Sequence, residues 1–173
     1  MNAQTDTIRI AGVVRESIVD GPGIRFVVFA QGCPHRCRGC HNEAALGFRG
    51  GKMCDVGKLL LEIKKNPLVS GVTFSGGEPF CQPEGFLSLA LKLKEENINI
   101  ISFTGYTYEE LMALAEENQY VGRLLCNIDV LIDGRFVLEK KDMTEQFKGS
   151  TNQRYIDMQA TRERGGPVVL ENL

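Results

Sequence analysis

The pattern that most restricts the fold of this chain is an alternation of buried strands with amphipathic helices. Ile24–Ala30 (IRFVVFA) and Gly71–Ser75 (GVTFS) are short runs rich in β-branched and aromatic residues, which is typical of strands buried on both faces. Between them, apolar residues of segment 56–63 recur at the spacing of one helix face, and Asp55 suits the N-cap. A strand, a helix and a strand in this order predict two parallel strands joined by a right-handed crossover.

The alternation continues along the chain, and a weaker one precedes it. The further elements that we expect are a leading strand at Thr7–Arg15, a helix near 86–93, a strand at Ile98–Thr104, a helix at Tyr108–Glu117 and a strand at Ile128–Ile132. Four or five strand–helix units are too few for a closed eight-stranded barrel. We therefore expect the α/β class, as a partial (incomplete) TIM-like βα barrel with mostly parallel strands.

Length and charge restrict the class of protein. The 173 residues predict a single domain, 1–173, because domains commonly hold roughly 100–200 residues. A formal net charge of −2 does not suggest a nucleic-acid partner held by bulk electrostatics. No apolar run approaches the roughly 20 residues needed to cross a bilayer. The first ten residues (MNAQTDTIRI) lack the basic and then apolar order of a signal peptide. We expect no membrane association and a cytoplasmic location.

Three of the six cysteines lie within eight residues of one long loop. Cys33, Cys37 and Cys40 form a C-x3-C-x2-C pattern directly after a predicted strand. Thiols of cytosolic proteins stay reduced, so clustered cysteines there usually bind metal or take part in chemistry. Cubane iron–sulfur clusters usually take four cysteine ligands. With three ligands, one iron keeps an open position that can bind a substrate, as on a catalytic zinc.

Other interpretations of the cysteines remain open. The three could form a zinc site completed by His35 or His41, or they could be buried thiols. Structural zinc sites usually pair two short Cys or His knuckles, and this chain has its two histidines in the same loop and no second knuckle. For Cys54, Cys81 and Cys126 we favour small buried or half-buried residues, although Cys81 could approach the site.

A second motif, Ser75-Gly-Gly-Glu-Pro79, follows the next strand. Its glycines, Gly76 and Gly77, let backbone polar groups approach a ligand closely, and Glu78 can accept hydrogen bonds from an ammonium group. Alone, such a triplet could be a simple turn. Both loops follow parallel strands, so they are expected at the same edge of the sheet, where α/β proteins place their sites.

The cysteine pattern, followed one βα unit later by Gly-Gly-Glu, resembles the signature of the radical S-adenosylmethionine superfamily. The resemblance implies that the three cysteines hold a [4Fe–4S] cluster whose open iron is chelated by S-adenosylmethionine. It also implies a set of cofactor-contacting residues, namely Gly39, Cys40, His41, Asn42, Gly76, Gly77 and Glu78. The family usually has an aromatic residue before the third cysteine. Here it is Gly39, which leaves only backbone to contact the nucleoside.

Further segments indicate a branch of the superfamily. Asp20–Arg25 (DGPGIR) resembles the same stretch of glycyl-radical activating enzymes. Segments 104–107, 133–136 and 149–157 resemble the branch whose partner is an anaerobic ribonucleoside-triphosphate reductase, over a core of about 10–157. Activators of pyruvate formate-lyase are longer, and some other activases insert a ferredoxin-like domain, for which this chain has no cysteine pattern.

The resemblance implies an enzyme that cleaves S-adenosylmethionine reductively and generates a glycyl radical on the reductase. A flavodoxin or ferredoxin is the expected electron donor, and no catalytic residue is expected beyond the cluster and the cofactor. Two alternatives remain, an activase of another glycyl-radical enzyme such as pyruvate formate-lyase, and a radical enzyme acting on a small molecule.

Overall fold

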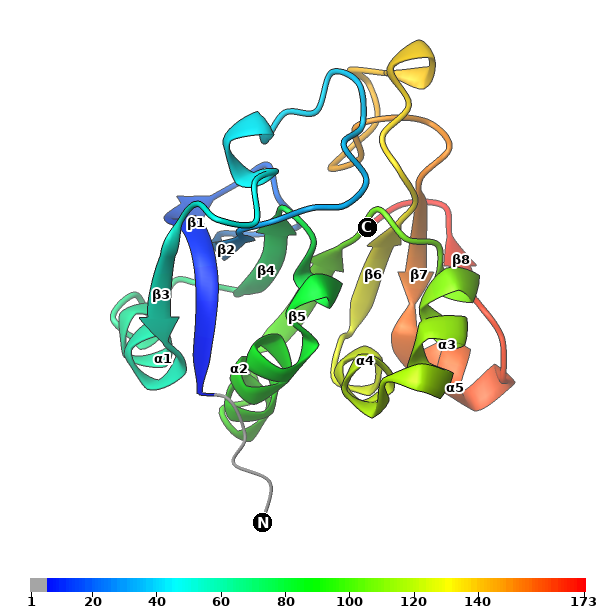
Figure 1. Ribbon diagram of the computed structural model, residues 1–173. Helices are drawn as coiled ribbons and strands as arrows, with labels where there is room; N and C mark the ends of the chain where they lie inside the picture. Colours follow the sequence, from blue (N-terminus) through cyan, green and yellow to red (C-terminus); the bar gives the residue numbers. More distant parts are fainter. Residues whose placement is uncertain (1–5) are drawn as a thin grey trace.

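The computed structural model describes residues 6–173, and the strands within them form one sheet (Figure 1). The strand order is β3-β1-β2-β4-β5-β6-β7-β8. The strands are β1 (Thr7–Ser17), β2 (Arg25–Ala30), β3 (Lys52–Asp55), β4 (Gly71–Gly76), β5 (Asn99–Phe103), β6 (Val130–Asp133), β7 (Arg154–Asp157) and β8 (Val169–Leu170). Residues 1–5, half of the N-terminal segment examined for a signal peptide, lie outside the described residues.

The centre of the sheet is parallel and its margins are antiparallel. Strands β2, β4, β5 and β6 run in the same direction in neighbouring pairs. On one side β1 pairs antiparallel with β2 and β3, and on the other β7 pairs antiparallel with β6 and β8. The predicted α/β fold with parallel central strands is confirmed. The antiparallel margins were not predicted, because β3, β7 and β8 are short segments without a clear strand pattern, and the direction of β1 was not assigned from the sequence.

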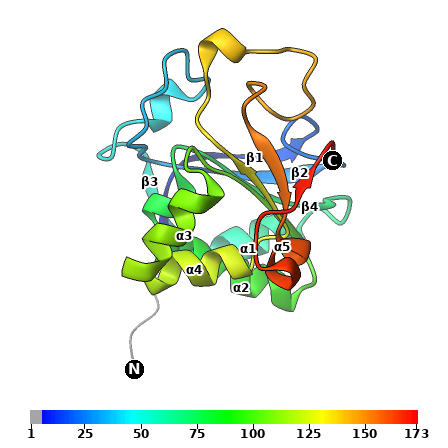
Figure 2. The same cartoon turned by 90° about the vertical axis from the view of Figure 1, so that its right-hand side faces the viewer.

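The helices cover one face of this sheet. In the described residues the α-helices are α1 (Val56–Lys64), α2 (Pro83–Glu95), α3 (Tyr108–Glu117), α4 (Gln119–Cys126) and α5 (Met158–Arg164). Figure 2 shows them gathered below the sheet, with the long loops above it. Alternate strand residues pack against them: Phe74 of β4, for example, meets Phe86 of α2 with ring centroids 4.9 Å apart. No helix within residues 6–173 has the length and apolar character needed to cross a bilayer.

Local capping signals fix where two of the predicted helices begin. The Asp55 carboxylate accepts a hydrogen bond from the Lys58 backbone N–H at 2.9 Å and so caps α1, as expected. Thr107 and Glu110 form a reciprocal capping box at the start of α3. Both caps satisfy backbone N–H groups that the first helical turn leaves unpaired.

The opposite face of the sheet holds a fully buried arginine. Arg25 Nε donates to Thr73 Oγ1 at 2.7 Å, and Nη2 donates to the Val72 carbonyl at 2.7 Å and to Asn99 Oδ1 at 3.0 Å. Burial lowers the pKa of Arg25 to about 10, and the charge of Asp129 partly opposes that shift. Thr73 Oγ1 in turn donates to the backbone carbonyl of the 18–24 loop at 2.8 Å. The buried guanidinium therefore fixes the loop that carries the DGPG motif.

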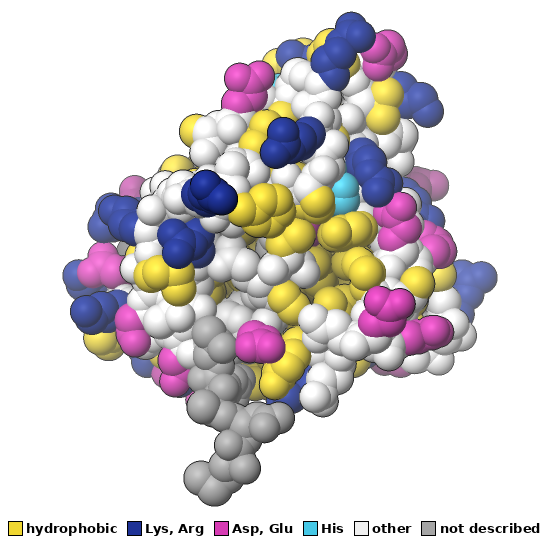
Figure 3. Space-filling model, viewed as in Figure 1, with side chains coloured by type: hydrophobic (Ala, Val, Ile, Leu, Met, Phe, Trp, Pro, Cys, Tyr) yellow, Lys and Arg dark blue, Asp and Glu magenta, His cyan; other side chains and the backbone are white. Residues whose placement is uncertain are grey.

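Charged side chains of both signs are interspersed over the face of the protein drawn in Figure 3. Figure 3 shows them around a central apolar strip on the face turned to the viewer. This mixed distribution agrees with the near balance of 20 Lys and Arg against 22 Asp and Glu.

Candidate functional site

The two loops predicted to form the site line one cavity. It has a volume of about 750 Å³ and lies at the carboxyl ends of the parallel strands. Cys33, Cys37 and Cys40 line it from the loop after β2, and Gly76 and Gly77 line it at the end of β4. Loops after β5 and β6 complete the wall. This position is where parallel α/β folds bring side chains from several strands together.

Tight backbone turns bring the cysteine loop around the cavity. Gly32 and Gly39 have φ values of 99° and 75°, which glycine adopts without the clash that a Cβ would cause. Arg36 also adopts a positive φ, of 48°. The turns place Cys33 in a buried position, 8% exposed, while Cys37 and Cys40 are half-buried. All six cysteines of the chain are free thiols.

Backbone N–H groups point at two of the sulfur atoms. Burial raises the pKa of Cys33, and the backbone N–H groups of His35 and Arg36, hydrogen-bonded to its sulfur, oppose that shift. The Asn42 N–H donates to Cys40 Sγ at 3.4 Å. Hydrogen bonds of this kind to cysteine sulfurs are among the features that set the reduction potential of iron–sulfur clusters.

The donor set fits a cluster better than a single ion. Within the described residues, no three His, Cys, Asp or Glu side chains come together closely enough to hold one metal ion. The three thiols are instead spread around one cavity, and a cubane presents its corners to ligands farther apart than those of one tetrahedral ion. His35, a fourth ligand in the zinc alternative, is already bonded to Glu78. The residues present therefore fit a cluster held by three thiolates.

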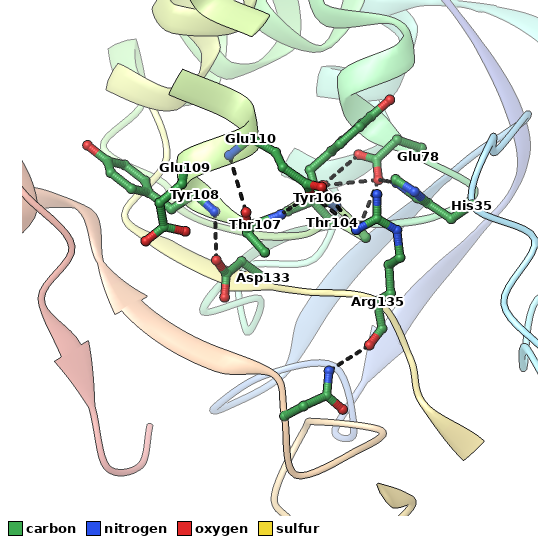
Figure 4. Close-up of polar contacts among 12 residues, drawn as sticks. His35, Glu78, Thr104, Tyr106, Thr107, Tyr108, Glu109, Glu110, Asp133 and Arg135 are labelled. Carbon is green, nitrogen blue, oxygen red and sulfur yellow. Dashed lines mark hydrogen bonds and ion pairs between the residues drawn. The ribbon is translucent and has the colours of Figure 1, made fainter. Parts of the chain in front are cut away.

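The Glu78 carboxylate is buried at the centre of a polar network (Figure 4). It accepts hydrogen bonds from the Gly105 N–H at 2.8 Å and from the Phe80 N–H at 3.1 Å. Thr104 Oγ1 lies 2.9 and 3.0 Å from its two oxygens. His35 Nε2 lies 3.0 Å from Oε2, and this nitrogen must carry the hydrogen because the carboxylate only accepts. Every partner of Glu78 named here is a donor.

This network joins the cysteine loop to the ends of β4 and β5. The His35 side chain is 4% exposed and packs edge-on against Tyr106, with ring centroids 4.4 Å apart. Glu78 does not line the cavity, although it was predicted to contact the cofactor with Gly76 and Gly77, which do. The role of His35 was not predicted. The available signal was its place between the first two cysteines.

The Gly-Gly loop also touches the cysteine loop directly. The Glu78 N–H donates to the Gly32 carbonyl at 2.8 Å. A Cβ on Gly77 would lie 2.3 Å from that same oxygen and 2.9 Å from the Ala45 carbonyl. Glycine at position 77 therefore permits a backbone approach that no other residue allows without moving one of the loops.

The remaining wall comes from the segment between β6 and β7. His41 and Asn42 of the cysteine loop, both predicted as cofactor contacts, also line the cavity. The His41 ring lies 5.3 Å from the ring of Phe136, which belongs to the segment between β6 and β7. A Cβ on Gly39 would lie 3.1 Å from Leu138, so the cysteine loop packs against this segment. Phe147 lines the cavity farther along the chain. The sequence marked parts of this region as family motifs but did not predict that they face the cysteines.

An ion pair between the half-buried Arg154 and the buried Asp133 holds this wall in place. Asp133, 1% exposed, accepts a hydrogen bond from Arg154 Nε at 2.9 Å and one from the Tyr108 N–H at 2.7 Å. Arg154 also contacts Glu109 at 2.8 Å, and bonding to the two carboxylates raises the pKa of Arg154. The hydrogen bond from Tyr108 to Asp133 connects segment 133–136 to the start of α3 (Figure 4).

Comparison with known proteins gives three informative matches. The model of the family described as "4Fe-4S single cluster domain" matches residues 19–156. An anaerobic ribonucleoside-triphosphate reductase-activating protein of Vibrio cholerae is 34% identical over 146 residues, covering 79% of this chain and 89% of that protein. A pyruvate formate-lyase-activating enzyme of Clostridium pasteurianum is 41% identical over 113 residues, covering 60% of this chain and 48% of that enzyme.

Other matches are consistent with these. An anaerobic ribonucleoside-triphosphate reductase-activating protein of Pasteurella multocida is 35% identical over 145 residues, covering 79% of this chain and 89% of that protein. Among solved structures, QueE from Escherichia coli shares 18% identity with a TM-score of 0.44, covering 58% of this chain and 53% of that one. A structural likeness of that extent supports no conclusion about this chain.

Proposed function

Because this chain belongs to the family of anaerobic ribonucleoside-triphosphate reductase-activating proteins and carries a 4Fe-4S single cluster domain, we propose that it generates a glycyl radical on such a reductase. It is a radical S-adenosylmethionine oxidoreductase that uses a [4Fe–4S] cluster. The observation that carries the proposal is the cavity lined by all three clustered cysteines and by both glycines of the Gly-Gly-Glu motif.

In this proposal the chain's own residues bind the cluster and the cofactor, orient them and shield the reactive species. Cys33, Cys37 and Cys40 are the proposed cluster ligands, and hydrogen bonds from the Asn42 N–H and from the backbone after Cys33 support their sulfurs. When bound, the reduced cluster and S-adenosylmethionine supply the chemistry, a reductive cleavage whose product abstracts a hydrogen atom from glycine. Excluding water from such a site would protect reactive species from side reactions.

The cofactor contacts remain predictions that the geometry supports to different degrees. Cys40, His41, Asn42, Gly76 and Gly77 line the cavity in which we propose that the cofactor binds. Gly39 is outside that lining and would contribute through its backbone. The Glu78 carboxylate is already hydrogen-bonded within the protein. A contact between it and the cofactor's ammonium group would therefore require an exchange of partners.

The electron donor is proposed to be a flavodoxin or a ferredoxin. The sequence contains one cysteine cluster of this spacing and no pattern for a second, so the electron is expected from a separate protein. We place the reaction in the cytoplasm, where the thiols that hold the cluster stay reduced. We treat the chain as one domain of the superfamily.

An activase of pyruvate formate-lyase is the second candidate function. The 41% identity to the Clostridium pasteurianum enzyme favours it, but this chain covers only 48% of that enzyme. The reductase-activating proteins of Vibrio cholerae and Pasteurella multocida are each covered over 89% of their length. The extent of the match therefore favours the reductase.

The test is a comparison of two acceptors under oxygen-free conditions. The reconstituted protein is mixed with a reductant, S-adenosylmethionine and either an anaerobic ribonucleotide reductase or a pyruvate formate-lyase from the same organism. We expect a glycyl signal in electron paramagnetic resonance on the reductase, and none with the Cys37→Ala variant. A signal on the lyase alone would select the second candidate. Turnover of a free metabolite without any glycyl signal would favour a small-molecule enzyme.

A further inference from the structure

Three of the four most exposed large apolar side chains within residues 6–173 line the cavity. Among the described residues, Ile18, Val19, Leu68 and Met143 are large apolar side chains with at least 70% of their surface exposed, at 73%, 70%, 70% and 84%. All of them except Leu68 line the cavity. Single exposed apolar residues are common on protein surfaces, but a group of them at the mouth of a functional cavity is typical of a binding surface.

These residues come from two segments distant in sequence. Ile18 and Val19 belong to the loop between β1 and β2, and Met143 belongs to the segment between β6 and β7. Figure 2 shows both segments (blue and orange) above the sheet, on the side away from α3 and α4. We call Ile18, Val19 and Met143 the apolar rim.

The loop that carries two of the three rim residues is held in place by hydrogen bonds. The carbonyl of Asp20 accepts the hydrogen bond from Thr73, which is bonded to the buried Arg25. The Asp20 carboxylate is bonded to the hydroxyl of Ser17. Ile18 and Val19 therefore point outward from a loop anchored on both sides. A binding surface fixed in advance loses less conformational entropy when a partner docks.

The charges around the rim nearly cancel. The charged residues that line the cavity there are Asp20, Lys141, Asp142, Glu145 and Lys148, two basic and three acidic. Lys148 is also paired with Glu145 at 2.8 Å. Because these charges nearly cancel, the mouth of the cavity would not attract a strongly charged partner. A partner would therefore bind here mainly through apolar contacts.

The interior behind the rim suits a slender polypeptide. The cavity is also lined by Phe29, Phe103 and Phe147, and by Gly76 and Gly77. A glycine has no side chain, so its α-carbon can approach the floor of the cavity while flanking apolar residues remain at the mouth.

We propose that the apolar rim docks the glycine-bearing segment of the anaerobic reductase, as an extended, largely uncharged peptide with apolar residues on either side of the glycine. This inference rests on the proposed function and adds to it the surface that receives the partner. Ile18, Val19 and Met143 act on the affinity for the partner and have no part in cleaving S-adenosylmethionine.

The experiment separates docking from cofactor chemistry. The variants are the double substitution Ile18→Ser with Val19→Ser, and Met143→Ser in the other segment. Leu61→Ser is the matched control, because Leu61 is 66% exposed on α1 and does not line the cavity. For each holoprotein, the initial rate of glycyl-radical formation is measured against reductase concentration. Cleavage of S-adenosylmethionine by reductant is measured without the reductase.

We expect the double variant to raise the reductase concentration for half-maximal rate about tenfold, with a smaller rise for Met143→Ser and none for Leu61→Ser. Reductase-independent cleavage should stay within about twofold of the unchanged protein. The proposal is overturned if neither rim variant changes the half-saturating concentration, or if both lose reductase-independent cleavage in proportion. If the unchanged protein cleaves the cofactor but forms no glycyl radical on the reductase, the proposed function fails, and the docking proposal with it.

Discussion

Glu78→Gln is the substitution whose effect follows most directly from the geometry. It keeps the shape of the side chain but replaces one carboxylate oxygen by an NH2 group. Oε1 accepts a hydrogen bond from the Phe80 N–H, and Oε2 accepts one from the Gly105 N–H. Whichever way the amide is turned, its NH2 group faces a backbone N–H that has lost its acceptor.

The cost can be estimated from that mismatch. A buried donor left without an acceptor costs about 1–3 kcal/mol of folding free energy. The bond from His35 weakens as well, because hydrogen bonds to charged groups are worth more than neutral ones. We therefore expect Glu78→Gln to lower the free energy of unfolding by about 2–4 kcal/mol. Small domains are stable by about 5–15 kcal/mol, so the variant should fold but be clearly weakened.

The measurement is urea unfolding of the cluster-free protein, kept reduced and followed by circular dichroism. The matched control is Glu62→Gln, whose carboxylate pairs with Arg15 and Lys65 at the surface and whose loss should leave the unfolding midpoint in place. If Glu78→Gln lies within about 0.5 kcal/mol of the unchanged protein, the network described here does not hold the two loops together.

Further predictions concern single residues of the site. Cys37→Ala should abolish the absorbance of the reconstituted cluster while Cys126→Ala preserves it, and the reverse result would show that the wrong ligands were chosen. Burial and neighbouring negative charges raise the pKa of Cys81 to about 12, so near neutral pH it should react with iodoacetamide far more slowly than the exposed Cys126. Equal labelling of the two peptides in mass spectrometry would contradict this. Gly77→Ala places a Cβ 2.3 Å from the Gly32 carbonyl, so the variant should bind S-adenosylmethionine at least about tenfold more weakly in equilibrium dialysis, and unchanged affinity would refute the close approach of the two loops.

The elements that were predicted correctly are those whose signal is local. Strands β2 and β4 are dense runs of β-branched and aromatic residues, and α1 and α3 carry their own caps at Asp55 and Thr107. Strand β3 was missed, because Lys52–Asp55 has no apolar run and is extended through its pairing with β1, for instance Cys54 with Ile8. Strands β7 and β8 and helix α5 are short, and the polar tail around them shows little periodicity.

The site, like the fold, has parts that a local sequence pattern predicts and parts that depend on contacts between distant residues. The spacing of Cys33, Cys37 and Cys40 was enough to place them on one cavity, because a short loop keeps them close. The contact between His35 and Glu78 joins residues 43 positions apart, and no spacing rule predicts it. The wall that carries Phe136 depends on how the segment between β6 and β7 crosses the end of the sheet, which is a property of the whole fold.

The central claim is that three thiolates hold a cluster with one iron open to the cofactor. Electron–nuclear double resonance on the reduced holoprotein, with S-adenosylmethionine labelled with ¹⁵N in its amino group and ¹⁷O in its carboxylate, tests this most directly. We predict hyperfine coupling of both labels to the cluster, lost in the Cys33→Ala variant. A protein that contains zinc without acid-labile sulfide, or a cluster that shows no coupling to either label, would contradict it.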